Sequence, residues 1–183
     1  MIVFKRKLWG TLSALTIIGI FLATSSQLLG APVPGGPGFV SVGSLAFKPN
    51  PPTLSYSFIS NRLYNNGGQY GAFFTPVYLP QGATITQLVL YFVDNGTSDI
   101  SVFLVSYPLD DPAAVTEMAY MTTSGASPAP RTLVVNPFAS GNLIDNQSNF
   151  YIVSVGLPNS INYSVGGVRI DYRFPTNLPL IMK

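Results

Sequence analysis

The chain has 183 residues, of which 47% are hydrophobic and 9% charged, and it contains neither histidine nor cysteine. Nine basic residues face seven acidic ones, but three of the nine are Lys5, Arg6 and Lys7, so the rest of the chain has six against seven and a net charge of −1. This composition excludes imidazole bases, thiolate nucleophiles and the usual zinc, iron and copper sites. It also lacks a basic stripe that would neutralise phosphates, so we expect no nucleic-acid partner.

The N-terminus has the pattern of an export signal. Basic residues 5–7 precede an apolar run at 8–23, and the small polar residues that follow favour cleavage near Ser25. Residues 8–29 also approach the ~20 that span a bilayer, so the alternative is a retained membrane anchor that holds an extracytoplasmic accessory subunit. Because the basic residues stay in the cytoplasm, both interpretations predict an exported domain, extracellular or at the cell surface, outside the cytoplasmic membrane.

The remainder of the chain is predicted to be one all-β domain. Residues 1–30 form the signal or anchor, 31–38 a Pro/Gly spacer, 39–174 the domain and 175–183 an extended tail. Short alternating runs are broken by turn residues about every 8 to 12 positions, and no stretch has helical periodicity. Strands are expected near residues 40–47, 54–59, 71–78, 84–93, 100–107, 115–122, 132–135, 150–155 and 167–174. This pattern predicts a two-sheet antiparallel sandwich, jelly-roll-like, after an N-terminal apolar helix.

Residues 94–99 join two of these predicted strands. Apolar residues share one face before and after the segment, and Asn95-Gly96 is a favoured tight turn, so the pattern predicts a β-hairpin. The oxygens of Asp94, Asn95 and Asp99 are also a candidate calcium site, and calcium is the one cofactor considered. The segment lacks the spacing and the distal glutamate of an EF-hand, and the same residue types are typical of turns, so we favour the turn.

The last predicted strand alternates in character. Val168 and Ile170 fall on one face, while Arg169, Asp171 and Arg173 fall on the other, as in a half-buried strand. One hypothesis is an anion site built from the two guanidiniums. We favour a solvated face on which Asp171 pairs with charges on the neighbouring strand.

Catalytic residues are scarce. Glu117 is the only glutamate, and the adjacent Asp110 and Asp111 would point to opposite sides of a strand, so no carboxylate pair is selected by its spacing. Without histidine a serine nucleophile would need a lysine base, and only Lys48 and Lys183 follow the N-terminal segment. We therefore predict that the protein is not an enzyme.

One segment offers a carbohydrate-binding alternative. Sugars stack on aromatic faces while amides bind their hydroxyl groups. The candidate residues for such a site are Tyr64, Asn65, Asn66, Gln69 and Tyr70. Tyrosines also pack within or beside sheets, and the sole tryptophan, Trp9, belongs to the N-terminal run.

Three parts of the sequence resemble a group of uncharacterised exported bacterial β-sandwich proteins, jelly-roll-like and found at the cell surface. They are residues 77–86 (VYLPQGATIT), 91–102 (YFVDN followed by ISV) and 167–172 (GVRIDY). The resemblance covers most of residues 39–174. It implies the fold and the compartment and carries over no functional residue.

The main functional hypothesis is a non-catalytic structural or interaction module of the cell surface. Few charges and a mean hydropathy of +0.35 suit a protein that assembles with itself or with other surface proteins. Leu178, Leu180 and Ile181 in the apolar tail would add to the sheet edge of a neighbour. The alternative is a lectin-like sandwich that binds glycans.

Overall fold

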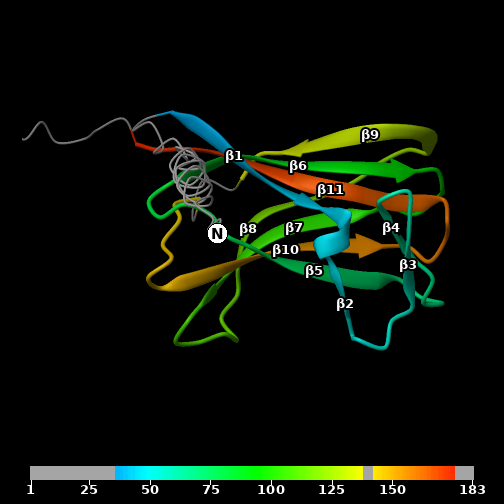
Figure 1. Ribbon diagram of the computed structural model, residues 1–183, viewed down its shortest axis with the longest axis horizontal. Coiled ribbons are helices and arrows are strands. Elements are labelled where there is room, and N and C mark those ends of the chain that lie inside the picture. The colour runs from blue at the N-terminus through cyan, green and yellow to red at the C-terminus, as the bar shows by residue number, and fades with distance from the viewer. Residues whose placement is uncertain (1–35, 138–141, 176–183) are drawn as a thin grey trace, which may run out of the picture. The chain divides into compact units, whose positions relative to one another are not determined.

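The computed structural model describes residues 36–137 and 142–175. They form two antiparallel sheets packed face to face, which confirms the predicted all-β, jelly-roll-like sandwich (Figure 1). The elements are β1 (Pro37–Gly43), the 3₁₀ helix η1 (Ser44–Ala46), β2 (Lys48–Asn50), β3 (Tyr56–Ile59), β4 (Arg62–Asn65), β5 (Gly71–Val77), β6 (Thr84–Asp94), β7 (Ser101–Pro108), β8 (Thr116–Thr122), β9 (Ser127–Val135), β10 (Asn149–Leu157) and β11 (Tyr163–Arg173).

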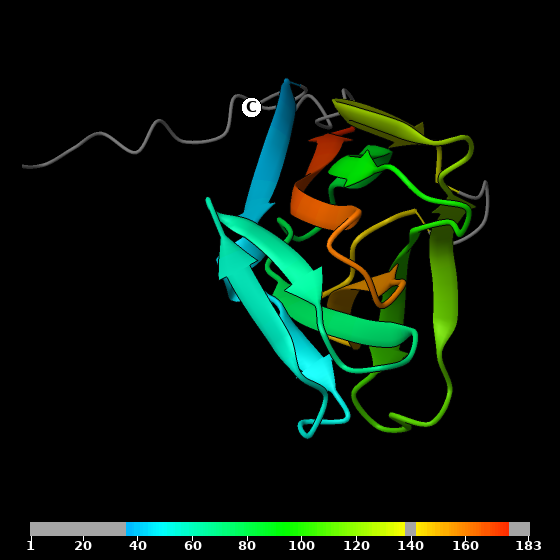
Figure 2. The same ribbon diagram turned by 90° about the vertical axis from the view of Figure 1, so that its right-hand side faces the viewer.

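The two sheets differ in strand order. Sheet A runs β3-β4-β11-β6-β9, with β1 pairing along the rest of β11, and sheet B runs β2-β5-β10-β7-β8. Figure 2 shows the β3–β4 hairpin and β8 on opposite sides of the sandwich. Within the described ranges no helix is long and apolar enough to cross a membrane. The predicted export signal or anchor and the tail residues Leu178, Leu180 and Ile181 lie outside these ranges.

The predicted hairpin at residues 94–99 is wrong. Strand β6 pairs with β11 and β9 in sheet A, whereas β7 pairs with β10 and β8 in sheet B, so the segment after Asp94 crosses from one sheet to the other. Both strands bury one face in the same core, and alternation identifies that face without identifying the partner strand. A turn between sheets therefore has the same sequence pattern as a hairpin.

Several elements differ from the sequence prediction. Strands β2 and β4 were not predicted, and the strand predicted at 40–47 ends at Gly43, where η1 begins. A turn in which Ser60 and Asn61 have φ values of 49° and 58° joins β4 to β3. Strand β9 begins at Ser127 and tolerates Pro128 and Pro130 because it lies at the edge of sheet A, where a missing N–H costs no ladder hydrogen bond.

The core lies between the sheets and is built from alternate residues of the strands together with Phe47, Ile100 and Ile144 from the connecting segments. Its fully buried large side chains are Phe47, Leu63, Phe73, Ile85, Leu88, Leu90, Ile100, Leu104, Met118, Ile144, Leu157 and Ile170. The predicted alternation of β11 agrees with this arrangement, since Val168 and Ile170 are buried. On its outer face Asp171 pairs with Arg169 of the same strand at 2.8 Å, so the expected partner on a neighbouring strand was wrong.

Candidate functional site

Three loops at one end of the sandwich surround a hollow of about 550 Å³, hereafter the loop hollow. The loops join β4 to β5, β6 to β7 and β10 to β11. The lining residues are Tyr70, Asn95, Gly96, Thr97, Ser98, Pro158, Asn159, Ser160, Asn162 and Tyr163. None of these side chains is charged, and six of the ten carry an amide or an aliphatic hydroxyl in addition to the two tyrosines.

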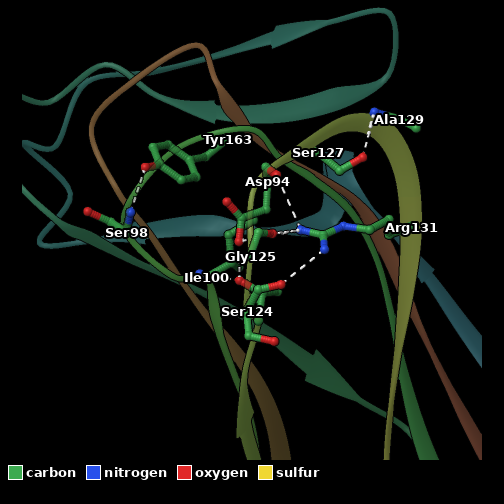
Figure 3. A network of polar contacts seen from close by, with 10 residues as sticks. Asp94, Ser98, Ile100, Ser124, Gly125, Ser127, Ala129, Arg131 and Tyr163 are labelled. Atoms are coloured by element: carbon green, nitrogen blue, oxygen red, sulfur yellow. Dashed lines mark hydrogen bonds and ion pairs between the residues drawn. The ribbon is translucent and has the colours of Figure 1, made fainter.

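Tyr163 holds the β6–β7 loop in place. Its phenol oxygen accepts a hydrogen bond from the backbone N–H of Ser98 at 2.9 Å (Figure 3). Gly96 packs directly on the same ring, and a Cβ atom at this position would overlap the phenol oxygen. The Asn95 N–H donates to the carbonyl oxygen of Asn162 at 3.0 Å. One backbone–backbone hydrogen bond and one bond to the Tyr163 phenol oxygen therefore fasten two walls of the loop hollow to each other.

Tyr70 forms the third side of the loop hollow. Its hydroxyl shares a hydrogen bond with the Ser101 hydroxyl at 2.9 Å, and its side chain lies over Gly156, where a Cβ atom would overlap it. Tyr70 is nevertheless 53% exposed. Gly156 and Ser101 are paired neighbours in sheet B, so Tyr70 rests on the outer face of that sheet.

Of the five predicted glycan-binding residues, Asn65 stabilises the structure of the β4–β5 loop. It is fully buried, and its amide nitrogen donates to the carbonyl oxygens of Gln69 at 2.7 Å and Leu157 at 2.8 Å. Its amide oxygen accepts from the Gly67 N–H at 2.9 Å. Asn65 thus shapes the loop that carries Tyr70 and has no polar atom left for a ligand.

The other predicted glycan residues are dispersed. Asn66 is exposed and donates to the Ser57 hydroxyl at 2.9 Å, and Gln69 is exposed on the same loop. Tyr64 and Arg62 alternate with the buried residues of β4, so Tyr64 faces the outer side of sheet A. Tyr70 is the one member of the predicted set that lines the loop hollow.

A polar network around the buried Asp94 lies next to the β6–β7 loop (Figure 3). The Thr123 hydroxyl accepts from the Ile100 N–H at 2.9 Å and donates to the Asp94 carboxylate. Arg131 of β9 lies 3.8 Å from that carboxylate, donates to the carbonyl oxygens of Ser124 at 3.0 Å and of Asp94 at 3.2 Å, and sits 5.0 Å from the Phe92 ring centre. The network ties the β6–β7 loop to the β8–β9 loop.

The candidate calcium ligands have different surroundings. Asp94 is 1% exposed and engaged in the network just described, whereas Asn95 and Asp99 are exposed. In the part of the chain that the structure describes, no group of three acidic, histidine or cysteine side chains is placed to hold a metal ion. The calcium hypothesis gains no support from this geometry.

A second hollow of about 430 Å³ lies at the other end of the sandwich, and seven of its nine lining residues are apolar or aromatic. Tyr151, one of them, is 3% exposed, and its phenol oxygen accepts from the Asp145 N–H at 2.7 Å. Burial, reinforced by the Asp145 carboxylate, raises the pKa of the Tyr151 phenol above its usual value.

The raised pKa predicts a loss of stability in alkali. In the unfolded chain Tyr151 ionises near pH 10, so its contribution is complete below that pH and is lost as the pH rises through the higher folded-state pKa. Urea unfolding at pH 9, 10 and 11 should show the stability advantage of the native chain over Tyr151→Phe shrinking with pH. A constant difference for Tyr151→Phe would contradict the assignment.

Comparisons with known proteins found no matching family model and no matching curated protein. Among solved structures, the chain is similar to the C-terminal CBM6 of LamC, a marine laminarinase from Zobellia galactanivorans, with 7% identity, a TM-score of 0.47 and 73% and 98% of the two chains covered. A family 35 carbohydrate binding module from Clostridium thermocellum is 11% identical with a TM-score of 0.47, and the match covers 73% of this chain and 97% of that one. CBM29_1 from Piromyces equi is 12% identical with a TM-score of 0.43, and the match covers 76% of this chain and 92% of that one. At these values the similarities carry no inference about what this chain binds.

Proposed function

We propose that this chain is an exported, non-catalytic glycan-binding module that holds a neutral carbohydrate in the loop hollow. The observation that carries the proposal is the lining, in which eight of ten residues bear an amide, a hydroxyl or a phenol and none bears a charge. Amides and hydroxyls both donate and accept hydrogen bonds, as sugar hydroxyl groups do. The absence of charged lining groups favours a neutral sugar over an acidic or phosphorylated one.

Tyr70 would supply the apolar contact that such a site needs. One side of this residue rests on Gly156, and half of its surface is exposed, which leaves the opposite ring face for a pyranose ring. The bonds that Ser98, Asn95 and Asn65 make hold the loops in advance of binding. A preformed hollow lowers the entropy cost of binding.

The proposal includes the domain organisation. The N-terminal basic and apolar residues support export, with the binding domain at residues 39–174 after the 31–38 spacer and the 175–183 tail following it. A module outside the cytoplasmic membrane would meet polysaccharides of its own surface or of the surroundings. Assembly through the tail, by Leu178, Leu180 and Ile181, stays a separate hypothesis.

A glycan array probed with the protein as its host exports it tests this function. We expect binding to neutral oligosaccharides, followed up by isothermal titration calorimetry. Tyr70→Ala should lower the affinity about tenfold or more, since aromatic contacts are frequent binding hot spots. Tyr78→Ala, an 87% exposed tyrosine at the other end of the sandwich, is the matched control and should bind as the native chain does. Equal affinity for Tyr70→Ala and the native protein, or binding confined to acidic glycans, would refute the site.

A further inference from the structure

The outer face of sheet B bears a surface rich in aromatic side chains, hereafter the aromatic face. It lies on the side of β5 and β10 that points away from sheet A (Figure 1). Its apolar members are outward residues of four paired strands, namely Phe74, Pro76, Phe103, Val105, Tyr107, Tyr120, Phe150 and Ile152, and Ser154 lies among them, paired with Phe74 and Phe103. No strand within the described ranges packs on this face.

The aromatic side chains form cross-strand pairs. Phe103 and Tyr120 stack with ring centres 4.5 Å apart, and Tyr107 and Phe150 stack at 5.1 Å. Tyr120 is 41% exposed and Phe150 37%, and the others are partly exposed. Soluble proteins rarely expose apolar patches of this extent unless the patch binds something.

Charges occur only at the two edges of the aromatic face among the described residues. Lys48 of β2 is paired with Phe74, and Glu117 of β8 is paired with Val105, so both side chains point outward from opposite edge strands. Measured along the strand direction alone, Lys48 and Glu117 are offset by one row of residues, about 6.6 Å. Two long side chains can bridge this offset when a Lys48 and a Glu117 of two facing sheets meet. The face therefore has a positive and a negative edge, and its uncharged centre is apolar except for Ser154.

We propose that the aromatic face binds the same face of a second copy of this chain, in a dimer with a two-fold axis parallel to the strands. Rotation about such an axis places β2 of one copy over β8 of its partner, so each Lys48 meets a Glu117 and two equivalent ion pairs form. The alternative axis across the strands would place like charges together. Charge complementarity thus selects one arrangement.

The size of the aromatic face suits such an interface. Five strands about 4.8 Å apart and a depth of about five residues at 3.3 Å per residue, which leaves the part of the sheet under Tyr70 uncovered, give roughly 400 Å² per copy. Both copies together bury roughly 800 Å², the size of a weak and reversible interface. Sheets pack about 10 Å apart when their side chains interdigitate, as the aromatic rows would do.

The dimer would also affect the proposed function. An axis parallel to the strands keeps both loop hollows at the same end of the assembly, so two glycan sites would face the same polymer and gain avidity. The dimer itself rests on the aromatic face alone and does not depend on glycan binding. Tyr70→Ala tests the loop hollow, whereas the variants below test the face, so either proposal can fail without the other.

Sedimentation equilibrium of the exported protein, measured in a buffer of low ionic strength, tests whether the dimer forms. We expect a monomer–dimer equilibrium whose dissociation constant rises about tenfold in Lys48→Glu and in Glu117→Lys, because each change reverses two ion pairs. The double variant K48E/E117K should restore the native value. Ile152→Lys, at the centre of the face, should give a monomer whose circular dichroism spectrum is unchanged.

Three results would overturn the dimer. One is a native protein that stays monomeric at millimolar concentration. Another is a dimer in which the charge reversals have no effect or are not rescued by the double variant. The third is a monomer that binds soluble laminarin or xylan and loses this binding in Ile152→Lys, which would assign the aromatic face to a polysaccharide.

Discussion

Replacing Arg131 with methionine should lower the free energy of unfolding by about 2–3 kcal/mol. Methionine keeps the apolar contact with Phe92, but it removes the donors to the carbonyl oxygens of Ser124 and Asp94 and leaves the Asp94 carboxylate without its cation. That carboxylate is 1% exposed, and its Oδ1 atom already lacks a hydrogen-bond partner. An uncompensated buried charge is costly, although the 30% exposure of Arg131 moderates the loss.

Urea unfolding followed by far-ultraviolet circular dichroism measures the change. Arg173→Met is the matched control, since Arg173 is exposed and belongs to neither ion pair of the described residues, and it should change stability by less than about 0.5 kcal/mol. Adding Asp94→Asn to Arg131→Met should recover part of the loss, because the amide removes the buried charge. A loss no larger than that of the control would mean that the network does not stabilise the fold.

Asn65→Leu should destabilise the domain by about 3 kcal/mol. The substitution removes three hydrogen bonds and leaves two carbonyl oxygens and one N–H unpaired, at Gln69, Leu157 and Gly67. Because the β4–β5 loop carries Tyr70, we also expect weaker glycan binding in the folded fraction. Asn66→Leu removes one exposed hydrogen bond to Ser57 and should cost well under about 1 kcal/mol.

Thermal and urea unfolding of both asparagine variants provide the comparison. Equal stabilities for Asn65→Leu and Asn66→Leu would refute the structural role of Asn65. If Asn65→Leu is destabilised but binds the glycan with normal affinity, the conformation of the β4–β5 loop does not matter for binding. The loop hollow would then hold its ligand without a contact from Tyr70.

The sequence by itself determined the fold class and much of each strand. Strands β5, β6 and β10 begin and end within a few residues of their predicted positions, and the burial of Val168 and Ile170 on β11 follows the predicted alternation. These features are local, because a period of two reports which face of a strand is buried. Composition likewise excluded histidine and cysteine chemistry without any structure.

Only the tertiary structure decided which segments meet. A connection that crosses from one sheet to the other after Asp94 and a hairpin at the same place would have the same alternation of apolar and polar residues. The alternation therefore could not show which strands pair with β6 and β7. Asn65 and Asn66 are the same residue type at adjacent positions, so the sequence does not distinguish them. In the structure Asn65 is buried with three hydrogen bonds, whereas Asn66 is exposed. The loop hollow gathers residues from positions 70, 95–98 and 158–163, and the aromatic face gathers alternate residues of four strands. Such long-range assembly depends on strand order, which is set by how the two sheets share one core and not by the spacing of residues along the chain.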